Sequence, residues 1–341
     1  MSLYPDLVFC HNIYGGKATG KQGLKMIREK RKVVLVGCGM VGMSYAYSML
    51  NQATCDELIL IDVNDERAIG ESMDLNHGLA FSNSSMTIRA GDYSDCEDAD
   101  IVTICAGVPR KAGESRTDLL NKNREVLKQI IKPIMESGFN GIFLVASNPV
   151  DILTEITCEL SGMNPRRVIG SGTTLDTARL RYMLGELLNC DPRSIHAYII
   201  GEHGDTEFVP WSQANLGAKS ILELVEESDG KITFSDLSHI EEDVRTAGKR
   251  IIEAKKATYY GIGMSLNRIT KAILGNENTV LTVSAQVRGE YGENDLFIGV
   301  PALVNANGIQ KILTFNLTDE ELEKFHLSAA RIRESKEMIN I

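Results

Sequence analysis

The segment VVLVGCGMVG, residues 33–42, decides the fold of the N-terminal half of the chain. Four apolar residues that predict a buried strand lead into three glycines, and the residues that follow predict a helix through Leu50. A second apolar segment, LILIDV at 58–63, predicts another strand, and it places Asp62 20 residues after Gly42. A G-x-G-x-x-G motif between a strand and a helix, with an acid about 20 residues further on, is typical of dinucleotide binding.

Each glycine of this motif has its own physical role. Gly37 permits a tight turn, Gly39 lets backbone N–H groups approach a pyrophosphate at the helix N-terminus, and Gly42 allows the helix to pack closely on the strand. Asp62 would accept hydrogen bonds from both ribose hydroxyls and would repel a 2′-phosphate, which favours NAD over NADP. The alternative is a glycine turn in an α/β sheet that binds no nucleotide. The cofactor contacts predicted in this unit are Gly37, Gly39, Met40, Val41, Gly42 and Asp62.

The same alternation continues toward the middle of the chain. DIVTICAG at 100–107 predicts a buried strand, residues 119–137 predict a helix, and GIFLVASNP at 141–149 predicts a strand that ends in a turn. Parallel strands that alternate with helices form a doubly wound α/β sheet of the Rossmann type. Ligands of such sheets bind beyond the carboxyl ends of the strands, so we expect a binding site at that edge.

The pattern changes after Pro149. We expect a second, α+β region with helices near 150–161 and 174–188, a strand HAYIIG at 196–201, a long helix from about 238 to 274, and a hairpin at 279–304. The last helix opens with TDEE, where Thr318 and Glu321 predict a capping box. We therefore divide the chain into an N-terminal arm (1–31), a NAD-binding Rossmann domain (32–149) and a C-terminal substrate domain (150–341).

The composition argues against several classes of protein. Thirty-six Lys and Arg against 46 Asp and Glu give a net charge of −10, which argues against a nucleic-acid binder, and no apolar run is long enough to cross a membrane. The seven cysteines form no C-x-x-C pair, so we expect buried free thiols in a reducing cytoplasm rather than disulfides or zinc. The basic arm is expected to pack on a neighbouring subunit or to extend freely, with a transit peptide as the alternative.

Two polar motifs in the second region carry candidate chemistry. In GEHGDTE, His203 lies between Gly201 and Gly204 just after the predicted strand. In LDTARLR, Asp176 and Arg179 are three residues apart on a predicted helix and so share one face. An Asp bound to His Nδ1 fixes the tautomer and stabilises the imidazolium, while an Arg presents a two-pronged donor to a carboxylate. The alternative is an ordinary surface His that meets neither residue.

Six motifs, in order, resemble the L-lactate and L-malate dehydrogenase family from about Arg31 to Glu337: GCGMVG, AGVPRKAGESR, ASNPVDILT, GTTLDTARLR, IGEHGDTE and GEYGENDLFIGVPA. The resemblance implies that His203 exchanges the proton, that Asp176 is its partner and that Arg179 anchors the substrate carboxylate. It also implies that the stretch 107–116 is a closing loop that brings Arg116 to the substrate carbonyl.

The resemblance implies roles for further positions. Asn148 would donate a hydrogen bond to the substrate oxygen, and Thr258 and Ile262 would line the pocket near the nicotinamide ring. The remaining cofactor contacts that it implies are Ala106, Gly107, Asn123 and Ser147. No metal is expected, because Arg116 and His203 would supply the electrophilic stabilisation that a metal ion would otherwise give.

Three residues give opposing indications about the substrate. Arg110 lies at the position where malate enzymes of the family have Arg and lactate enzymes have Gln, and a cation there would pair with the second carboxylate of oxaloacetate. With pyruvate it would be unpaired, at a cost of about 3–5 kcal/mol if buried. Thr258 and Glu114 are of the lactate type. We predict an L-lactate dehydrogenase, with malate dehydrogenase as the alternative because of Arg110, and a non-catalytic NAD-binding sensor as a more distant one.

A regulatory site is also implied by the resemblance. In bacterial lactate dehydrogenases, positions that match Arg181 and His196 form a pocket between subunits for fructose 1,6-bisphosphate. Two cationic groups brought together by a symmetry axis would favour such an anion. The alternative is a solvated helix residue and an ordinary strand residue with no ligand. The family likewise implies a homotetramer.

Overall fold

The computed structural model describes residues 30–108 and 116–338. Within these residues a nine-stranded sheet has the order β12-β11-β10-β6-β5-β4-β1-β2-β3. Its parallel part runs from β3 to β6, which is the doubly wound order that the sequence predicts, and the fold class is confirmed. The elements of this part are β1 (Lys32–Val36), α1 (Met40–Gln52), β2 (Glu57–Ile61), α2 (Asp65–Gly78), β3 (Thr87–Ala90), β4 (Ile101–Ile104), α3 (Arg116–Glu136), β5 (Ile142–Val145), α4 (Val150–Ser161) and β6 (Val168–Gly170).

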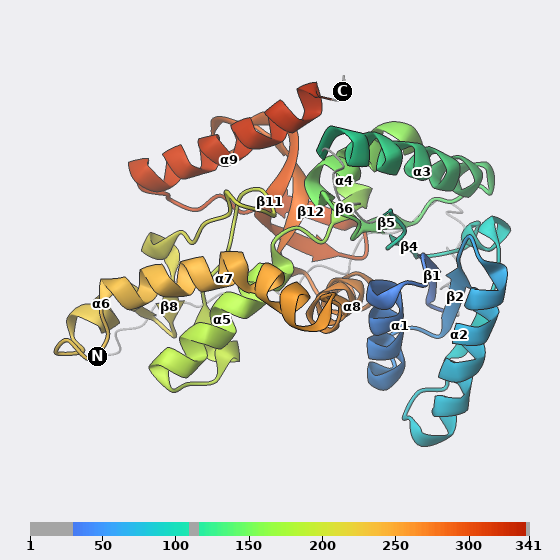
Figure 1. Cartoon of the computed structure of the whole chain (residues 1–341), viewed down its shortest axis with the longest axis horizontal. Coiled ribbons are helices and arrows are strands. Elements are labelled where there is room, and N and C mark those ends of the chain that lie inside the picture. Colours follow the sequence, from blue (N-terminus) through green and yellow to red (C-terminus); the bar gives the residue numbers. More distant parts are fainter. Residues whose placement is uncertain (1–29, 109–115, 339–341) are drawn as a thin grey trace, which may run out of the picture.

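Helices cover both faces of the parallel strands. Figure 1 shows α3 and α4 above the sheet and α1 below it, beside α8 (Tyr260–Leu274). The strands β1, β2, β4 and β5 consist mainly of buried Val, Ile and Leu, because a sheet covered on both sides excludes water from both rows of side chains. The predicted strands and helices up to Pro149 are confirmed to within a few residues.

The second region adds antiparallel strands to the same sheet and a separate lobe beside it. β10 (Thr279–Arg288) pairs with β6 and with β11 (Asn294–Asn305), so the predicted hairpin is confirmed, and β12 (Gly308–Ile312) follows β11. The other elements are α5 (Thr174–Leu188), β7 (Ile195–His196), β8 (Asn215–Leu216), β9 (Lys219–Ser220), α6 (Ile221–Glu226), α7 (Phe234–Lys255) and α9 (Asp319–Glu337). The capping box of α9 is present, with Thr318 as the N-cap and Glu321 returning to its backbone.

Two predictions in this region are wrong. The long helix expected over 238–274 is two helices, because Lys256 adopts a left-handed conformation (φ 74°), its N–H bonds to the Ile252 carbonyl, and α7 ends there. The strand expected over 196–201 is broken: β7 pairs with β8, whereas Ile200 bridges to Phe208 and Gly201 to Gly299. This segment therefore crosses from the small sheet to the large one.

None of the helices in the described parts of the chain combines the length and the apolar character needed to cross a membrane.

Candidate active site

The glycine turn after β1 forms one wall of a cleft at the carboxyl edge of the sheet. Gly37 has a φ of 104°, and a Cβ there would lie 2.6 Å from the Ala106 backbone nitrogen. A Cβ on Gly42 would lie 2.1 Å from the Gly37 carbonyl oxygen, so α1 packs directly on the turn. Both positions therefore exclude a side chain, as the sequence motif predicts.

The N-terminus of α1 suits an anionic group. Its N-cap is Gly39, no side chain caps it among the described residues, and its first turn carries no acid. A Cβ on Gly39 would meet no atom within 4 Å, so the space in front of the helix is open. Backbone N–H groups at such an end attract a phosphate, which fits the pyrophosphate of NAD.

Asp62 lies where the second strand ends and faces the same cleft. Its two carboxylate oxygens accept hydrogen bonds from the backbone N–H groups of Cys38 (2.8 Å) and Asn64 (3.0 Å), which hold the carboxylate beside the glycine turn. The cleft has a volume of about 630 Å³ and is lined in part by Gly37, Gly39, Asp62, Ala106 and Gly107. These residues fit the phosphate and ribose groups of NAD.

Two predicted cofactor residues act on the backbone at the edge of this cleft. The Ser147 hydroxyl donates to the Ala106 carbonyl at 2.6 Å, and the Asn123 side-chain oxygen accepts from the Val108 N–H at 2.9 Å. Both residues are buried, and they tie the end of β4 to β5 and α3. A direct contact of either residue with the cofactor stays a prediction.

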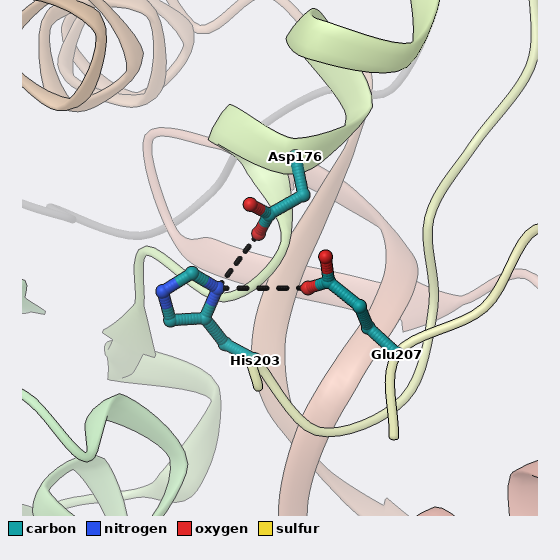
Figure 2. A group of neighbouring side chains, drawn as sticks. All are labelled: Asp176, His203 and Glu207. Atoms are coloured by element: carbon teal, nitrogen blue, oxygen red, sulfur yellow. Dashed lines mark hydrogen bonds and ion pairs between the residues drawn. The ribbon is translucent and has the colours of Figure 1, made fainter. Parts of the chain in front are cut away.

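Asp176, Arg179 and His203 meet in space, as the family resemblance implies. The Asp176 carboxylate bonds His203 Nδ1 at 2.7 Å through one oxygen and Arg179 Nη1 at 2.7 Å through the other. The Asp176 side chain is 1% exposed, against 25% for His203. Figure 2 shows the second ring nitrogen of His203 pointing away from the carboxylate, which leaves it available to a ligand.

The position of His203 is set by backbone contacts between distant segments. Gly201 and Gly299 exchange two backbone hydrogen bonds of 2.9 and 3.0 Å, which dock the loop on β11. The Glu202 N–H donates to the Ser328 hydroxyl of α9, and the His203 N–H donates to Asp151 of α4 at 2.9 Å. The backbone that carries His203 is therefore bonded to β11, α9 and α4.

The charges in this site shift two pKa values in opposite directions. The neighbouring Asp176 carboxylate raises the pKa of His203 to about 10, against the opposing effect of burial. Burial pushes the pKa of Asp176 upward, but the His203 imidazolium and then Arg179 outweigh it, so the pKa of Asp176 is lowered. His203 is thus an imidazolium at neutral pH, the form that can give a proton to a carbonyl oxygen.

A second cleft of about 910 Å³ joins these groups to the remaining predicted residues. Thr258 reaches it only because α7 ends at Lys255 and α8 begins at Tyr260, which leaves Thr258 in the loop between them. The predicted residues that line this cleft are Val41, Asn148, Asp176, Arg179, His203, Thr258 and Ile262. A small ligand in it would lie between the His203 imidazole, the Arg179 guanidinium and Val41 of α1, at the end of the cofactor cleft.

Two buried acids beside His203 were not predicted from the sequence. Asp151 is 3% exposed and holds the His203 backbone, and its pKa is raised to about 6 by burial. Glu207 is 4% exposed, and its carboxylate lies 3.8 Å from His203 Nδ1. The sequence signals were that Asp151 belongs to the ASNPVDILT motif and Glu207 to the GEHGDTE motif, but an acid without a pairing partner in the sequence pattern is usually solvated.

Asp176, His203 and Glu207 bring donor atoms within 4.8 Å of one another, a spacing at which such groups can hold a metal ion. The Arg179 guanidinium bound to Asp176 opposes a second cation at this point. We therefore interpret the cluster as one that handles a proton, and the absence of a metal stays a prediction.

Two predicted site residues lie at or beyond the edge of the described chain. Arg110 falls outside the described residues. Arg116 is the first residue of α3, and the position of its side chain is likewise outside what the structure describes.

The two residues predicted for an effector lie close along the chain but differ in environment. Arg181 donates to the Ala197 carbonyl at 3.0 Å, and its guanidinium lies 4.9 Å from the centre of the Tyr198 ring. It lines a groove of about 410 Å³ that also contains Arg193 and Arg268. His196 is exposed on β7 and is not among the residues that line this groove.

Comparison with known proteins identifies the family. Residues 31–170 match the lactate/malate dehydrogenase NAD binding domain, and residues 173–340 match the lactate/malate dehydrogenase alpha/beta C-terminal domain. The chain belongs to the lactate/malate dehydrogenase family. The first match ends with β6, the last parallel strand, and the second begins just before α5. The predicted resemblance is confirmed, and so is NAD as the cofactor of the N-terminal domain; the division at residue 149 stays a prediction.

Individual relatives within the lactate/malate dehydrogenase family agree with this assignment. The chain is 55% identical to L-lactate dehydrogenase 2 of Bacillus anthracis over 304 residues, which is 89% of this chain and 96% of that protein. It resembles the crystal structure of a lactate dehydrogenase from a Medee basin deep-sea metagenome library, with a TM-score of 0.90, 52% identity, and coverage of 91% and 99%. It also resembles the minor L-lactate dehydrogenase of Enterococcus mundtii in its ligands-bound form, with a TM-score of 0.89, 49% identity, and coverage of 91% and 98%.

Proposed function

We propose that the protein is an NAD-dependent L-lactate dehydrogenase that interconverts pyruvate and L-lactate. The observation that carries the proposal is the His203 imidazole, bound to Asp176 and facing a cleft that adjoins the glycine turn after β1. Relatives that are more than half identical over most of the chain carry the name L-lactate dehydrogenase, which supports the same activity.

NADH, when bound, supplies the hydride equivalent to C2 of the 2-oxo acid. His203 gives its proton to the carbonyl oxygen, and Asp176 stabilises the imidazolium that does so. Arg179 donates one N–H to Asp176, and its remaining N–H groups bind the substrate carboxylate. Asn148 donates a hydrogen bond to the substrate oxygen from the turn after β5, while Thr258 and Ile262 limit the width of the pocket. Oxidation of L-lactate runs through the same contacts in reverse.

Arg116 completes the electrophilic contacts in this proposal. It follows the predicted closing loop at the start of α3, and its guanidinium polarises the carbonyl once the loop excludes water. The support is the sequence motif, since the side chain lies outside the described residues.

Malate dehydrogenase is the second candidate, and the observation that favours it is Arg110. A guanidinium beside the substrate tail would pair with the second carboxylate of oxaloacetate. Thr258 at the cleft and the names of the relatives favour the smaller pyruvate instead.

Steady-state kinetics on pyruvate and oxaloacetate test the choice. We expect kcat/KM for pyruvate to exceed that for oxaloacetate, and we expect Arg110→Gln to lower the oxaloacetate value at least about tenfold while changing the pyruvate value much less. A wild-type ratio that strongly favours oxaloacetate would overturn the lactate proposal. Failure to oxidise NADH with any 2-oxo acid of a broad panel would favour the non-catalytic sensor.

The finer predictions from the family resemblance are kept as proposals. We propose a cytoplasmic homotetramer with fructose 1,6-bisphosphate bound near Arg181 and His196, between subunits. The groove that Arg181 shares with two other arginines supports an anionic ligand. The effector proposal fails if the sugar bisphosphate changes neither the pyruvate KM nor the subunit assembly measured by light scattering.

A further inference from the structure

Glu207 is a buried acid for which the proposed mechanism has no role. Its side chain is inside the protein, and Figure 2 shows its carboxyl directed toward His203 next to Asp176. One oxygen lies 3.8 Å from His203 Nδ1 and, within the described residues, takes part in no hydrogen bond. A buried carboxyl oxygen without such a contact is costly if it is charged, so the protonation state of Glu207 needs an explanation.

The two arginines near Glu207 form ion pairs with other acids, although Arg245 Nε has no hydrogen-bond partner among the described residues. Arg245 of α7 donates to the Glu207 backbone carbonyl at 3.3 Å, and it is shared with Glu241 (3.3 Å) and Glu242 (2.6 Å) on its own helix. Arg179 of α5 is bonded to Asp176. Glu207 therefore has no guanidinium bonded to its carboxyl among the described residues.

Of the two carboxyl groups, Asp176 is better placed than Glu207 to carry the negative charge. It is bonded to the His203 ring and to Arg179, at 2.7 Å each. The other acid that faces His203 is Asp151 of α4, which bonds the His203 backbone rather than its ring. Carboxyl oxygens of Asp176 and Glu207 lie within 4.8 Å of each other. When two buried carboxyl groups are this close, one of them takes up a proton, and it is the one with fewer cationic partners.

The pKa shifts agree with this geometry. Burial raises the pKa of Glu207 well above its usual value, and the neighbouring Asp176 carboxylate raises it further. His203 and the two arginines oppose this rise without cancelling it. Asp176, by contrast, has a lowered pKa.

We propose that Glu207 is a positioning residue that stays a neutral carboxylic acid, donates its hydroxyl hydrogen to the Asp176 carboxylate, and so limits how tightly Asp176 holds the proton of His203. A carboxylate that accepts an additional hydrogen bond has less charge to offer the imidazolium. An ionised Glu207 would do the opposite, because a second negative charge would trap the proton on the ring. The catalytic consequence rests on the proposed function, since oxidation of a 2-hydroxy acid requires His203 to release that proton and take up another.

Two substitutions in the full chain separate the neutral from the ionised acid. Glu207→Gln keeps a neutral side chain with N–H donors, whereas Glu207→Leu keeps the bulk and removes the donor. The measurement is the titration of the His203 ring by NMR in protein with isotope-labelled histidine, with the signal assigned by its loss in His203→Ala. Glu253→Gln, an exposed acid on α7 that also lines the cleft, is the matched control.

We expect the His203 titration to stay within about 0.3 pH units of wild type in Glu207→Gln and in the control, and to rise by at least about 0.5 units in Glu207→Leu. A fall in both Glu207 variants would show that Glu207 is ionised and would overturn the proposal. No shift in Glu207→Leu, with only a lower Tm, would reduce Glu207 to a packing residue and would also overturn it.

Two further readouts keep the test decisive. If Glu207→Leu does not fold, infrared difference spectra of wild type and Glu207→Gln decide the case: a protonated-carboxyl carbonyl band lost in the variant supports the proposal, and its absence from wild type overturns it. If the chain proves inactive on lactate, the proposed function fails but the ring titration still reports on Glu207. If it is active, the kcat/KM profile for lactate oxidation moves to higher pH in Glu207→Leu.

Discussion

Replacement of Asp176 by Asn gives the sharpest test of the proposed site. The carboxylate is the largest cause of the raised His203 pKa, from 6.5 to about 10. At about 1.4 kcal/mol per pKa unit, this corresponds to a stabilisation of the imidazolium on the order of 5 kcal/mol. An amide of the same shape removes the charge and presents an N–H to Nδ1, which favours the wrong tautomer of the ring.

The expected result is a loss in turnover with a change in its pH dependence. We expect kcat/KM for pyruvate to fall about 10³ to 10⁴-fold at pH 7, because both the charge on the ring and its orientation are lost. The reduction activity that remains should decline as the pH rises through about 6.5, near the ordinary pKa of His, rather than through about 10 as in wild type.

The assay is NADH oxidation followed by absorbance from pH 5 to 10.5, with NADH affinity measured separately by fluorescence. Asp229→Asn, the same change in an exposed turn where φ is 54°, is the matched control and should behave as wild type. If Asp176→Asn kept the wild-type pH profile, or if its defect were a loss of NADH binding, the assignment of Asp176 as the partner of His203 would be refuted.

Three further predictions follow from the same contacts. Gly39→Ala should lower NADH affinity without a change in Tm, because its Cβ would enter the open space before α1. Gly42→Ala should lower both NADH affinity and Tm, because its Cβ would lie 2.1 Å from the Gly37 carbonyl oxygen. Equal losses of Tm in the two variants would contradict this. Arg179→Lys should raise the pyruvate KM at least about tenfold with a smaller effect on kcat, since an ammonium cannot bind Asp176 and a carboxylate in the same planar geometry; an unchanged KM would place the substrate elsewhere. The raised pKa of His203 contributes stability that is fully present below about pH 6.5 and is lost as the pH rises through about 10. Tm should therefore fall more steeply between pH 7 and 10.5 in wild type than in Asp176→Asn. Parallel curves of Tm against pH would exclude this linkage.

Much of the fold and part of the site could be predicted from the sequence, because they depend on spacing along the chain. The alternation of apolar segments with Gly37, Gly39 and Gly42 indicates strand, turn and helix. Gly37 and Gly42 avoid close contacts that a Cβ would make with Ala106 and with the Gly37 carbonyl oxygen, and Gly39 leaves the space before α1 open. Asp176 and Arg179 share a helix face for the same reason, and the structure shows them bonded.

The meeting of Asp176 with His203 was predicted from the family resemblance rather than from spacing. The two residues lie on different segments, α5 and the loop that docks on β11. The Gly201–Gly299 pair docks the loop on β11, and the segment before the loop is bonded to α5, where the Ile199 N–H donates to the Thr177 hydroxyl at 2.9 Å. No local pattern in either segment encodes that contact.

What only the tertiary structure decided is where the chain departs from its local pattern and which polar groups are buried. Lys256 ends α7 in a left-handed conformation, without the Gly that usually marks such an end. The sequence therefore suggested one helix where two exist. This break between the helices brings Thr258 to the cleft. The residues around Glu207 in the sequence are typical of an exposed acid, yet tertiary packing buries its side chain beside Asp176 and His203. Burial and the distances between charges depend on contacts between segments far apart in the chain, and they set the pKa values of the site. Local spacing along the chain sets only the secondary structure.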